Sequence, residues 1–447
     1  MIRGALAVLP KGPVLADVGI SGGTIEAIGG PGDLTGSTVV DANDLVLLPG
    51  AIDPHVHVNT RFGDWVTRDD FYTSTVPAAF GGTTTIIDFA IPLPGETARS
   101  AFDRCRKEAN ATAAVDYALH ACITRDSFDA SLADLAHLRA AGVVSVKVFS
   151  AYRTTIGLSF AEIERVLTRA AELDLLVLVH AETDGIIEAA MADEVAAGHL
   201  GPRGHAASRP AVAEEDAIIK VADLAGKAGA RVFFVHVSSA EGAEAVRQAR
   251  RRGQAVLAET CVHYLFLDDD VYDRPDGELW ICSPPIRSQE HQHALWNALE
   301  DNTFDLVSTD HNCFDSHQKA LHRDDFRRVP NGLPGVELRL PVLLGAVRDG
   351  RLRWEELAQL TSEAPARIFG LWPQKGRIAV GSHADLVLVD PAGSTDLSVT
   401  HMATDFSPFR DLRGEGSVVQ TWLRGRCLVD RDRFIGQRGY GSWAYVG

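Results

Sequence analysis

The sequence predicts an α/β fold in which a (β/α)8 barrel of the TIM type carries a small β-sandwich domain built from both chain ends. Eight short apolar runs alternate with stretches of helical periodicity, and eight strands close such a barrel. The first and last parts of the chain instead read as short strands with Gly-rich turns. The 447 residues exceed the roughly 250 to 300 at which one core stops growing, so a second domain is expected.

The barrel strands are expected near residues 46–58, 83–91, 115–123, 145–150, 175–182, 231–239, 255–265 and 304–311. Helical periodicity separates them, for instance over 159–171 and 240–250. Longer gaps after 182 and 265 predict insertions in the loops that follow those strands. Segments 17–29, 376–390 and 418–429 read as strands that pair across the two chain ends. The predicted domains are 1–50 with 375–447 for the β-sandwich and 51–374 for the barrel.

Composition excludes several classes of protein. Lys and Arg number 43 against 60 Asp and Glu, which gives a formal charge of −17 at pH 7. This charge repels phosphate backbones and anionic membranes, so neither nucleic acid nor a membrane is an expected partner. No apolar run approaches the roughly 20 residues that span a bilayer. The six cysteines show no C-x-x-C spacing and are expected to be free thiols, which predicts a cytoplasmic location.

Histidines and an acid near the ends of the apolar runs predict a metal site. His55 and His57 alternate along one strand, so both imidazoles point to the same face. Later runs end in further groups that bind metals or sit beside them: Lys147, His180, His236 and Asp310. Any one of these histidines alone is more often a satisfied buried residue. Because strand ends carry the chemistry in this fold, the shared placement of all six residues favours one dinuclear site.

Lys147 is the least expected member of this set. Lysine is almost never fully buried unless it is paired, yet here it interrupts an apolar strand. One interpretation is a buried ion pair with an acid that the sequence does not identify. The other is a chemical role at the metal site.

Several longer motifs resemble one family. They are Gly50-Ala-Ile-Asp-Pro-His-Val-His57, Gly81-Gly-Thr-Thr-Thr-Ile-Ile-Asp-Phe89, Lys147-Val-Phe-Ser-Ala-Tyr152, Ile281-Cys-Ser-Pro-Pro-Ile-Arg287, Thr309-Asp-His311 and Pro330-Asn-Gly-Leu-Pro-Gly-Val-Glu-Leu-Arg339. Nearly end to end, the chain resembles the D-hydantoinase/dihydropyrimidinase family of the metal-dependent amidohydrolase superfamily. The last three motifs are more specific to that family than the histidines are.

The resemblance implies a cofactor and a ligand set. Two divalent ions are expected per chain, zinc first, with Mn²⁺ or Co²⁺ as alternatives. Lys147 would be carboxylated to N6-carboxylysine and would bridge both ions, with a hydroxide between them. His55 and His57 would bind one ion together with Asp310, and His180 and His236 would bind the other. Asp310 would also act as general base and then general acid.

The resemblance also assigns residues to the substrate. Tyr152 matches the donor of a hydrogen bond to the oxyanion of the tetrahedral intermediate. Backbone groups of Ser283 and Asn331 match positions that hold the ring amide. An apolar pocket for the exocyclic side chain would be lined by Phe62, Trp65, Phe149 and Ile156. The expected reaction opens a 5-substituted hydantoin or a dihydropyrimidine, a small cyclic amide, to an N-carbamoyl amino acid.

Other readings stay open at this stage. Asn59 stands where hydantoinases often carry an acid, and an asparagine there resembles allantoinases, although the Glu-Pro-Gly that commonly follows in them is absent. A dihydroorotase would place Arg at that position and would need a cationic clamp, for which Arg61 is a weak candidate. A non-catalytic relative that acts in protein interaction is disfavoured, because every ligand position is retained. The family also implies a homotetramer, with a homodimer as the alternative.

Overall fold

A computed structural model describes residues 1–445, and its main feature is a barrel of parallel strands. In order around the barrel they are β6 (Ala51–His57), β9 (Thr83–Ala90), β10 (Asp116–Cys122), β11 (Ser145–Phe149), β12 (Leu176–His180), β13 (Arg231–Phe234), β14 (Val256–Cys261), β15 (Leu306–Ser308) and β16 (His311–Asn312). β15 pairs with β14, and β16 pairs with β6. β15 and β16 belong to one segment of the chain that is interrupted at Thr309-Asp310. Because this segment pairs with the last strand on one side and the first on the other, it closes the barrel.

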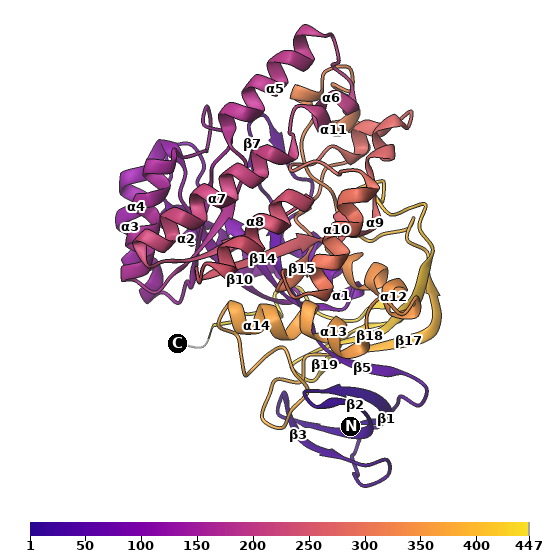
Figure 1. The fold of residues 1–447 in the computed structure, drawn as a ribbon. Coiled ribbons are helices and arrows are strands. Elements are labelled where there is room, and N and C mark those ends of the chain that lie inside the picture. The colour runs from indigo at the N-terminus through magenta and orange to yellow at the C-terminus, as the bar shows by residue number, and fades with distance from the viewer. Residues whose placement is uncertain (446–447) are drawn as a thin grey trace.

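Helices follow the strands and cover the outside of the barrel (Figure 1). They are α1 (Phe71–Phe80), α2 (Ala98–Thr112), η1 (Arg125–Ser127), α3 (Phe128–Ala140), α4 (Phe160–Glu172), α7 (Ala211–Ala228), α8 (Ala240–Arg251), α10 (Gln289–Glu300), α12 (Arg339–Arg348), α13 (Trp354–Ala358), η5 (Gln359–Glu363) and α14 (Ala364–Ile368). α4 shows why such helices form: Ser159 and Glu162 make a capping box, and Ile163 and Val166 lie on its buried face.

The two insertions expected from the sequence are present. α5 (Asp184–Ala196) and α6 (Pro202–Ala207) separate β12 from α7. After β14 come α9 (Val262–Phe266), η2 (Asp269–Asp273) and η3 (Gly277–Trp280), and after β16 come α11 (Ser316–Ala320) and η4 (Phe326–Arg328). α5, α6 and α11 lie at the opposite end of the molecule from the N-terminal strands (Figure 1). These insertions build the loops beyond the carboxyl ends of the barrel strands.

Both chain ends build one β-domain, as the sequence predicted, and its hydrogen-bonded strands form one mixed sheet. Its strands are β1 (Ile2–Leu9), β2 (Gly12–Ser21), β3 (Thr24–Gly29), β4 (Val40–Asp41), β5 (Val46–Pro49), β17 (Leu386–Thr395), β18 (Gly414–Leu423), β19 (Arg426–Asp430) and β20 (Arg433–Phe434). β5 lies between β1 and β17 and pairs with each, so it joins the two ends in one hydrogen-bonded sheet. The domain limits at 50 and 375 stay predictions, and the last two residues of 375–447 lie outside the described part of the chain.

The strand expected at 46–58 is two strands in different sheets. The chain breaks at Gly50, whose N–H donates to the Asp385 carbonyl at 2.7 Å. A Cβ at Gly50 would lie 2.3 Å from Thr84 Oγ1, so only glycine fits this crossing. The runs expected at 231–239 and 255–265 also end early, at Phe234 and Cys261. Apolar residues continue past both strands because the loop after β13 and helix α9 after β14 are buried as well.

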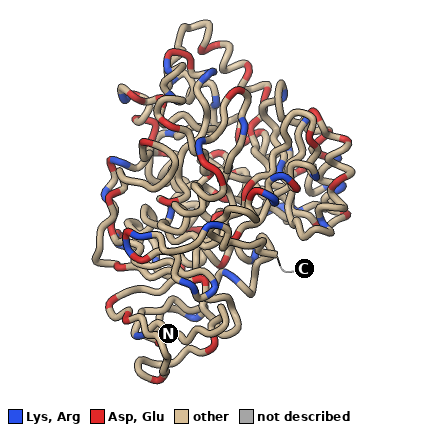
Figure 2. Tube along the Cα trace, turned by 180° about the vertical axis from the view of Figure 1, so that it is seen from behind, with Lys and Arg blue, Asp and Glu red and all other residues tan. Residues whose placement is uncertain are grey.

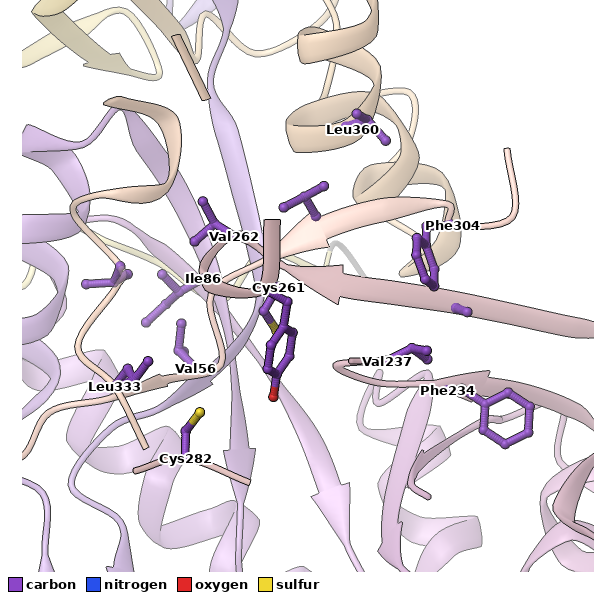
Figure 3. Close-up of a cluster of buried hydrophobic side chains, with 14 of the residues drawn as sticks. Val56, Ile86, Phe234, Val237, Cys261, Val262, Cys282, Phe304, Leu333 and Leu360 are labelled. Atoms are coloured by element: carbon purple, nitrogen blue, oxygen red, sulfur yellow. The ribbon is translucent and has the colours of Figure 1, made fainter. Parts of the chain in front are cut away.

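Strand side chains alternate between two apolar layers. Val56, Phe234 and Cys261 pack into the larger cluster (Figure 3). Phe233, next to Phe234, points the other way and belongs to the inner cluster together with Phe89. Phe89 lies 4.8 Å from the rings of both His55 and His57, so an apolar floor supports the predicted site.

A buried ion cluster fastens the terminal sheet to the barrel. Lys375 Nζ lies 2.7 Å from Asp116 of β10 and 2.5 Å from Asp385, just before β17. Removing one partner of such a buried pair costs roughly 3–5 kcal/mol. The charged residues elsewhere are interspersed over the surface (Figure 2), and exposed pairs contribute at most about 1 kcal/mol each. Within residues 1–445, no helix is both long and apolar enough to cross a bilayer.

Candidate active site

The structure brings His55, His57 and Asp310 together at the carboxyl end of the barrel. His55 Nε2 lies 3.0 Å and His57 Nε2 3.2 Å from the same Asp310 oxygen, Oδ1. Both histidines come from β6, as the alternation predicted, and Asp310 lies in the break between β15 and β16. All three side chains are buried, and their ligand atoms lie within 4.8 Å of one another. This geometry is that of a candidate metal site.

His180, His236 and Lys147 lie on neighbouring strands of the same barrel. His180 Nδ1 is 2.9 Å from His236 Nε2, and the His236 ring is 5.4 Å from that of His55. Lys147 is 1% exposed, with its Nζ 4.9 Å from the Phe89 ring centre and 5.1 Å from that of Phe149. Within residues 1–445 it makes no ion pair with an acid; Asp310 and Glu259 act on it only through their charge. The ion-pair interpretation of Lys147 therefore finds no partner.

Two carboxylates that the sequence analysis missed fix the orientation of these histidines. Glu259 of β14 hydrogen-bonds His55 Nδ1 and accepts from the His236 backbone N–H at 3.3 Å. Glu182, in the loop after β12, hydrogen-bonds His180 Nε2 at 2.7 Å. A carboxylate behind a ligating imidazole selects its tautomer. Glu259 was visible in the sequence as a lone acid within a predicted apolar strand, whereas nothing marked Glu182.

These tautomers test whether the residues fit a metal. When His55 Nδ1 donates to Glu259, its Nε2 presents a lone pair to the Asp310 carboxylate 3.0 Å away. When His180 Nε2 donates to Glu182, its Nδ1 presents a lone pair to His236 Nε2 at 2.9 Å. Two acceptors facing each other at such distances need a cation or a proton between them. Imidazole and carboxylate donors suit Zn²⁺, and they also bind other divalent metals.

Burial and neighbouring charges set the protonation of the group. Burial disfavours the His55 cation, but Asp310 and Glu259 raise its pKa to about 9. Burial lowers the pKa of His57 to about 4 and that of Lys147 to about 8. Burial opposes ionisation of Asp310, yet His55 and His57 hold its pKa well below the ordinary value. Asp310 is therefore a carboxylate at neutral pH.

Several of these residues adopt a strained backbone. φ is 42° at His236, 47° at Asp310 and 63° at Tyr152, all in the left-handed region that non-glycine residues rarely adopt. Such conformations cost on the order of 1–3 kcal/mol each and persist where the surroundings impose them. Their concentration at one end of the barrel is typical of a functional site.

A cavity of about 560 Å³ opens above these residues. Its wall includes His57, Lys147, His180, His236, Asp310, Tyr152, Ser283, Asn331, Phe62, Trp65, Phe149 and Ile156. The structure thus gathers the predicted substrate contacts and the predicted apolar lining in the cavity that the candidate ligands reach. Only His55, beneath them, is not part of the wall. Asn331 Oδ1 is buried and has no hydrogen-bond partner within residues 1–445, so it remains free for a ligand, whereas the Ser283 side chain lies beside the Tyr152 hydroxyl.

Sequence reasoning missed the charged part of the wall apart from Arg61. Arg327, Arg328, His322 and Asp64 also line the cavity, together with Arg61. They come from short irregular segments near the surface, in which the sequence offers no periodicity to mark them. Asn59, which suggested an allantoinase, does not line this cavity; its Nδ2 donates to Glu108 Oε2 at 3.2 Å.

The barrel and this donor set define a class: imidazoles, a lysine and an aspartate at the carboxyl ends of parallel strands form the site of a metal-dependent amidohydrolase. The family model described as "Amidohydrolase family" matches residues 46–428. The chain is 38% identical to a D-hydantoinase of Geobacillus stearothermophilus, over 96% of this chain and 92% of that protein. It is 37% identical to a D-phenylhydantoinase of Escherichia coli O1:K1, over 99% and 97%.

Solved structures agree with the sequence relatives. The dihydropyrimidinase of Brevibacillus agri NCHU1002 superposes with a TM-score of 0.95 at 38% identity, covering 99% of this chain and 97% of that one. The L-hydantoinase of Arthrobacter aurescens gives a TM-score of 0.92 at 30% identity, covering 99% and 98%. The chain therefore belongs to the D-hydantoinase/dihydropyrimidinase family within the amidohydrolases, as the sequence motifs indicated.

Proposed function

We propose that this protein hydrolyses the ring of a 5-substituted hydantoin or a dihydropyrimidine and releases an N-carbamoyl amino acid. One observation carries the proposal: five of the six candidate ligands share the wall of a single cavity with Tyr152, Ser283 and Asn331, and the sixth, His55, lies directly beneath them. Relatives named D-hydantoinase and dihydropyrimidinase, matched over nearly the whole chain, support it. Asn59 faces Glu108 instead of the cavity, so the feature that suggested allantoin does not bear on substrate choice.

The proposed cofactor is a pair of divalent ions, zinc first, with Mn²⁺ or Co²⁺ as alternatives. His55, His57 and Asp310 would hold one ion, His180 and His236 the other, and N6-carboxylysine at Lys147 both. When bound, such ions supply a hydroxide at neutral pH and polarise the scissile carbonyl. Carboxylation needs an uncharged amine, and burial, which lowers the Lys147 pKa to about 8, makes that form accessible. The lack of an acid paired with Lys147 supports the same assignment.

Asp310 is proposed to carry the proton. It is ionised at neutral pH because His55 and His57 hold its pKa low, so it can accept a proton as the nucleophile attacks. It would return that proton to the departing ring nitrogen, since an amide anion is a poor leaving group. The left-handed backbone at Asp310 holds the carboxylate between the two β6 histidines and the cavity.

Tyr152 is proposed to stabilise the oxyanion. Burial raises the pKa of its hydroxyl, so the group keeps its proton and can donate a hydrogen bond. The Tyr152 ring lies 5.2 Å from the His180 ring, which brings the hydroxyl to the cavity side of the candidate metal ligands. Ser283 and Asn331 would hold the ring amide, and Phe62, Trp65, Phe149 and Ile156 would surround the start of the exocyclic substituent.

A ring-opening assay on metal-quantified protein tests this proposal. Hydantoin, 5-phenylhydantoin, dihydrouracil, allantoin and dihydroorotate should be compared at neutral pH. Turnover of the first three is expected, and allantoin opened far faster than any of them would overturn the substrate assignment. A homotetramer, with a homodimer as the alternative, is proposed from the family and is checked by light scattering on the same sample. A cytoplasmic location is proposed because the six cysteines are all unbridged.

A further inference from the structure

The charged mouth of the cavity has no part in the proposed chemistry, and we infer from it which substituent the substrate carries. We propose that Arg61 and Arg328 recognise a carboxylate at the end of the exocyclic side chain of the substrate. The preferred substrate would then be a hydantoin whose 5-substituent is a short apolar chain ending in an anion. This inference rests on the ring-opening function proposed above and specifies its substrate.

Two segments carry the arginines and meet over the cavity. Arg61 belongs to a hairpin of β7 (Arg61–Phe62) and β8 (Trp65–Val66). Arg328 ends η4, three residues before Asn331. The hairpin is tied to this segment, because Trp65 Nε1 donates to the Arg328 carbonyl at 3.2 Å. The contact holds the two arginine-bearing segments against one another at the mouth.

The charges at the mouth do not cancel. Arg327 is already neutralised: its Nε and Nη2 each lie 2.7 Å from a carboxylate oxygen of Asp325. Within the described chain, Arg61 and Arg328 form no ion pair, and Asp64 is the one acid among the exposed wall residues. Two unpaired guanidiniums against one carboxylate leave the mouth positive, on a chain whose formal charge is −17. A positive opening in a negative protein attracts anions specifically to that opening.

The wall changes character with depth, and this sets the shape of the substituent. Phe62, Phe149 and Ile156 are partly or fully buried, whereas Arg61 and Arg328 are exposed. Phe62 lies next to Arg61 in the hairpin and 5.5 Å from the His57 ring, so the apolar zone reaches from the candidate metal ligands to the arginines. Burying a carboxylate in the apolar zone without a partner would be costly. An anion at the end of an apolar spacer avoids that cost and meets guanidiniums that can bind it through two hydrogen bonds.

The test compares two substrates of nearly equal shape, 5-(2-carboxyethyl)hydantoin and its amide, 5-(2-carbamoylethyl)hydantoin. We expect kcat/KM to favour the carboxylate by about tenfold at low ionic strength, the size expected for two solvent-exposed charge pairs. In the double variant Arg61→Gln/Arg328→Gln the ratio of kcat/KM for the carboxylate to that for the amide should fall to about one. Added salt should reduce the preference of the unchanged protein, because screening weakens exposed ion pairs.

Arg323→Gln is the matched control. Arg323 is exposed and lies in the same loop region, but it does not line the cavity, and its replacement removes one of the two positive charges that the double variant removes. The carboxylate preference should persist in it. The inference is overturned if the unchanged protein opens the amide with the same kcat/KM as the carboxylate, or if the double variant still prefers the carboxylate. If metal-loaded protein also fails to open unsubstituted hydantoin, the proposed ring-opening function is wrong, and not only the inference about its substituent.

Discussion

The Arg209 guanidinium lies 5.0 Å from the centre of the Tyr152 ring and donates a hydrogen bond to the Glu182 carboxylate. Glu182 in turn holds His180 Nε2 at 2.7 Å. A buried arginine therefore connects the proposed oxyanion donor to a candidate metal ligand. Its contacts make Arg209 a positioning residue, since it acts on the chemistry through Tyr152 and His180.

Replacement of Arg209 should therefore lower kcat more than it raises KM. For Arg209→Met we expect kcat to fall by about tenfold, part of the 10²–10³ that one oxyanion donor supplies. Arg209→Lys, which keeps the charge beside Glu182, should recover some of the loss. Steady-state kinetics with metal quantification on both variants checks this. Unchanged kcat in Arg209→Met would assign the arginine to packing alone.

Tyr152→Phe isolates the hydroxyl from the ring. We expect kcat to fall by roughly 10² or more, because the oxyanion loses a preorganised donor while the ring keeps its packing. KM and metal content should change little. If kcat is retained in the variant, Tyr152 contributes packing only.

Lys147→Ala tests the proposed carbamate. The variant should lose both metals and all activity, because the proposed carbamate would hold both ions and an alanine side chain offers no ligand. A small carboxylic acid such as acetate should restore part of the activity by replacing the carbamate. Metal analysis with and without acetate follows the effect. Full activity in the metal-depleted variant would falsify the dinuclear account.

The pH dependence of reactivation tests the same residue in the unchanged chain. Burial lowers the Lys147 pKa from its ordinary value of 10.5 to about 8, so the reactive neutral amine increases as pH rises toward 8. Metal-stripped protein, given zinc and the same concentration of dissolved carbon dioxide at every pH, should regain activity faster as pH rises through about 8. Above that value the rate should level off, because the Lys147 amine is already uncharged. A rate that falls over this range would contradict carboxylation at the free amine.

Lys319 lies close in the fold to both residues that are proposed to hold the substrate ring. Its Nζ is fully buried and donates to the Ile281 carbonyl at 2.6 Å, and the same oxygen accepts from Gly332 N–H at 3.0 Å. Ser283 and Asn331 lie on either side of this junction. Lys319→Met removes the donor at nearly constant volume. We expect KM to rise by about threefold to tenfold, which corresponds to the free energy of roughly one hydrogen bond. An unaltered KM with a lower melting temperature would show a structural role only.

Much of this account could be predicted from the sequence. Candidate ligands such as His180 and Asp310 were visible because parallel strands end on one side of a barrel, so residues distant in sequence must meet there. Strand limits were less accurate, as at Gly50, where a tight crossing splits one apolar run between two sheets. Glu182 and Arg209 were invisible because their importance comes from a contact between two loops. Arg328 was missed for the same reason.

A turnover assay on metal-quantified protein decides whether the chain is a two-metal enzyme that opens cyclic amides. Hydantoin, 5-phenylhydantoin and dihydrouracil should be offered at neutral pH to protein whose zinc, manganese and cobalt contents have been measured. The account predicts turnover of these substrates with about two metals per chain, the number a two-metal amidohydrolase site holds. Protein that carries both metals and opens none of them would contradict it.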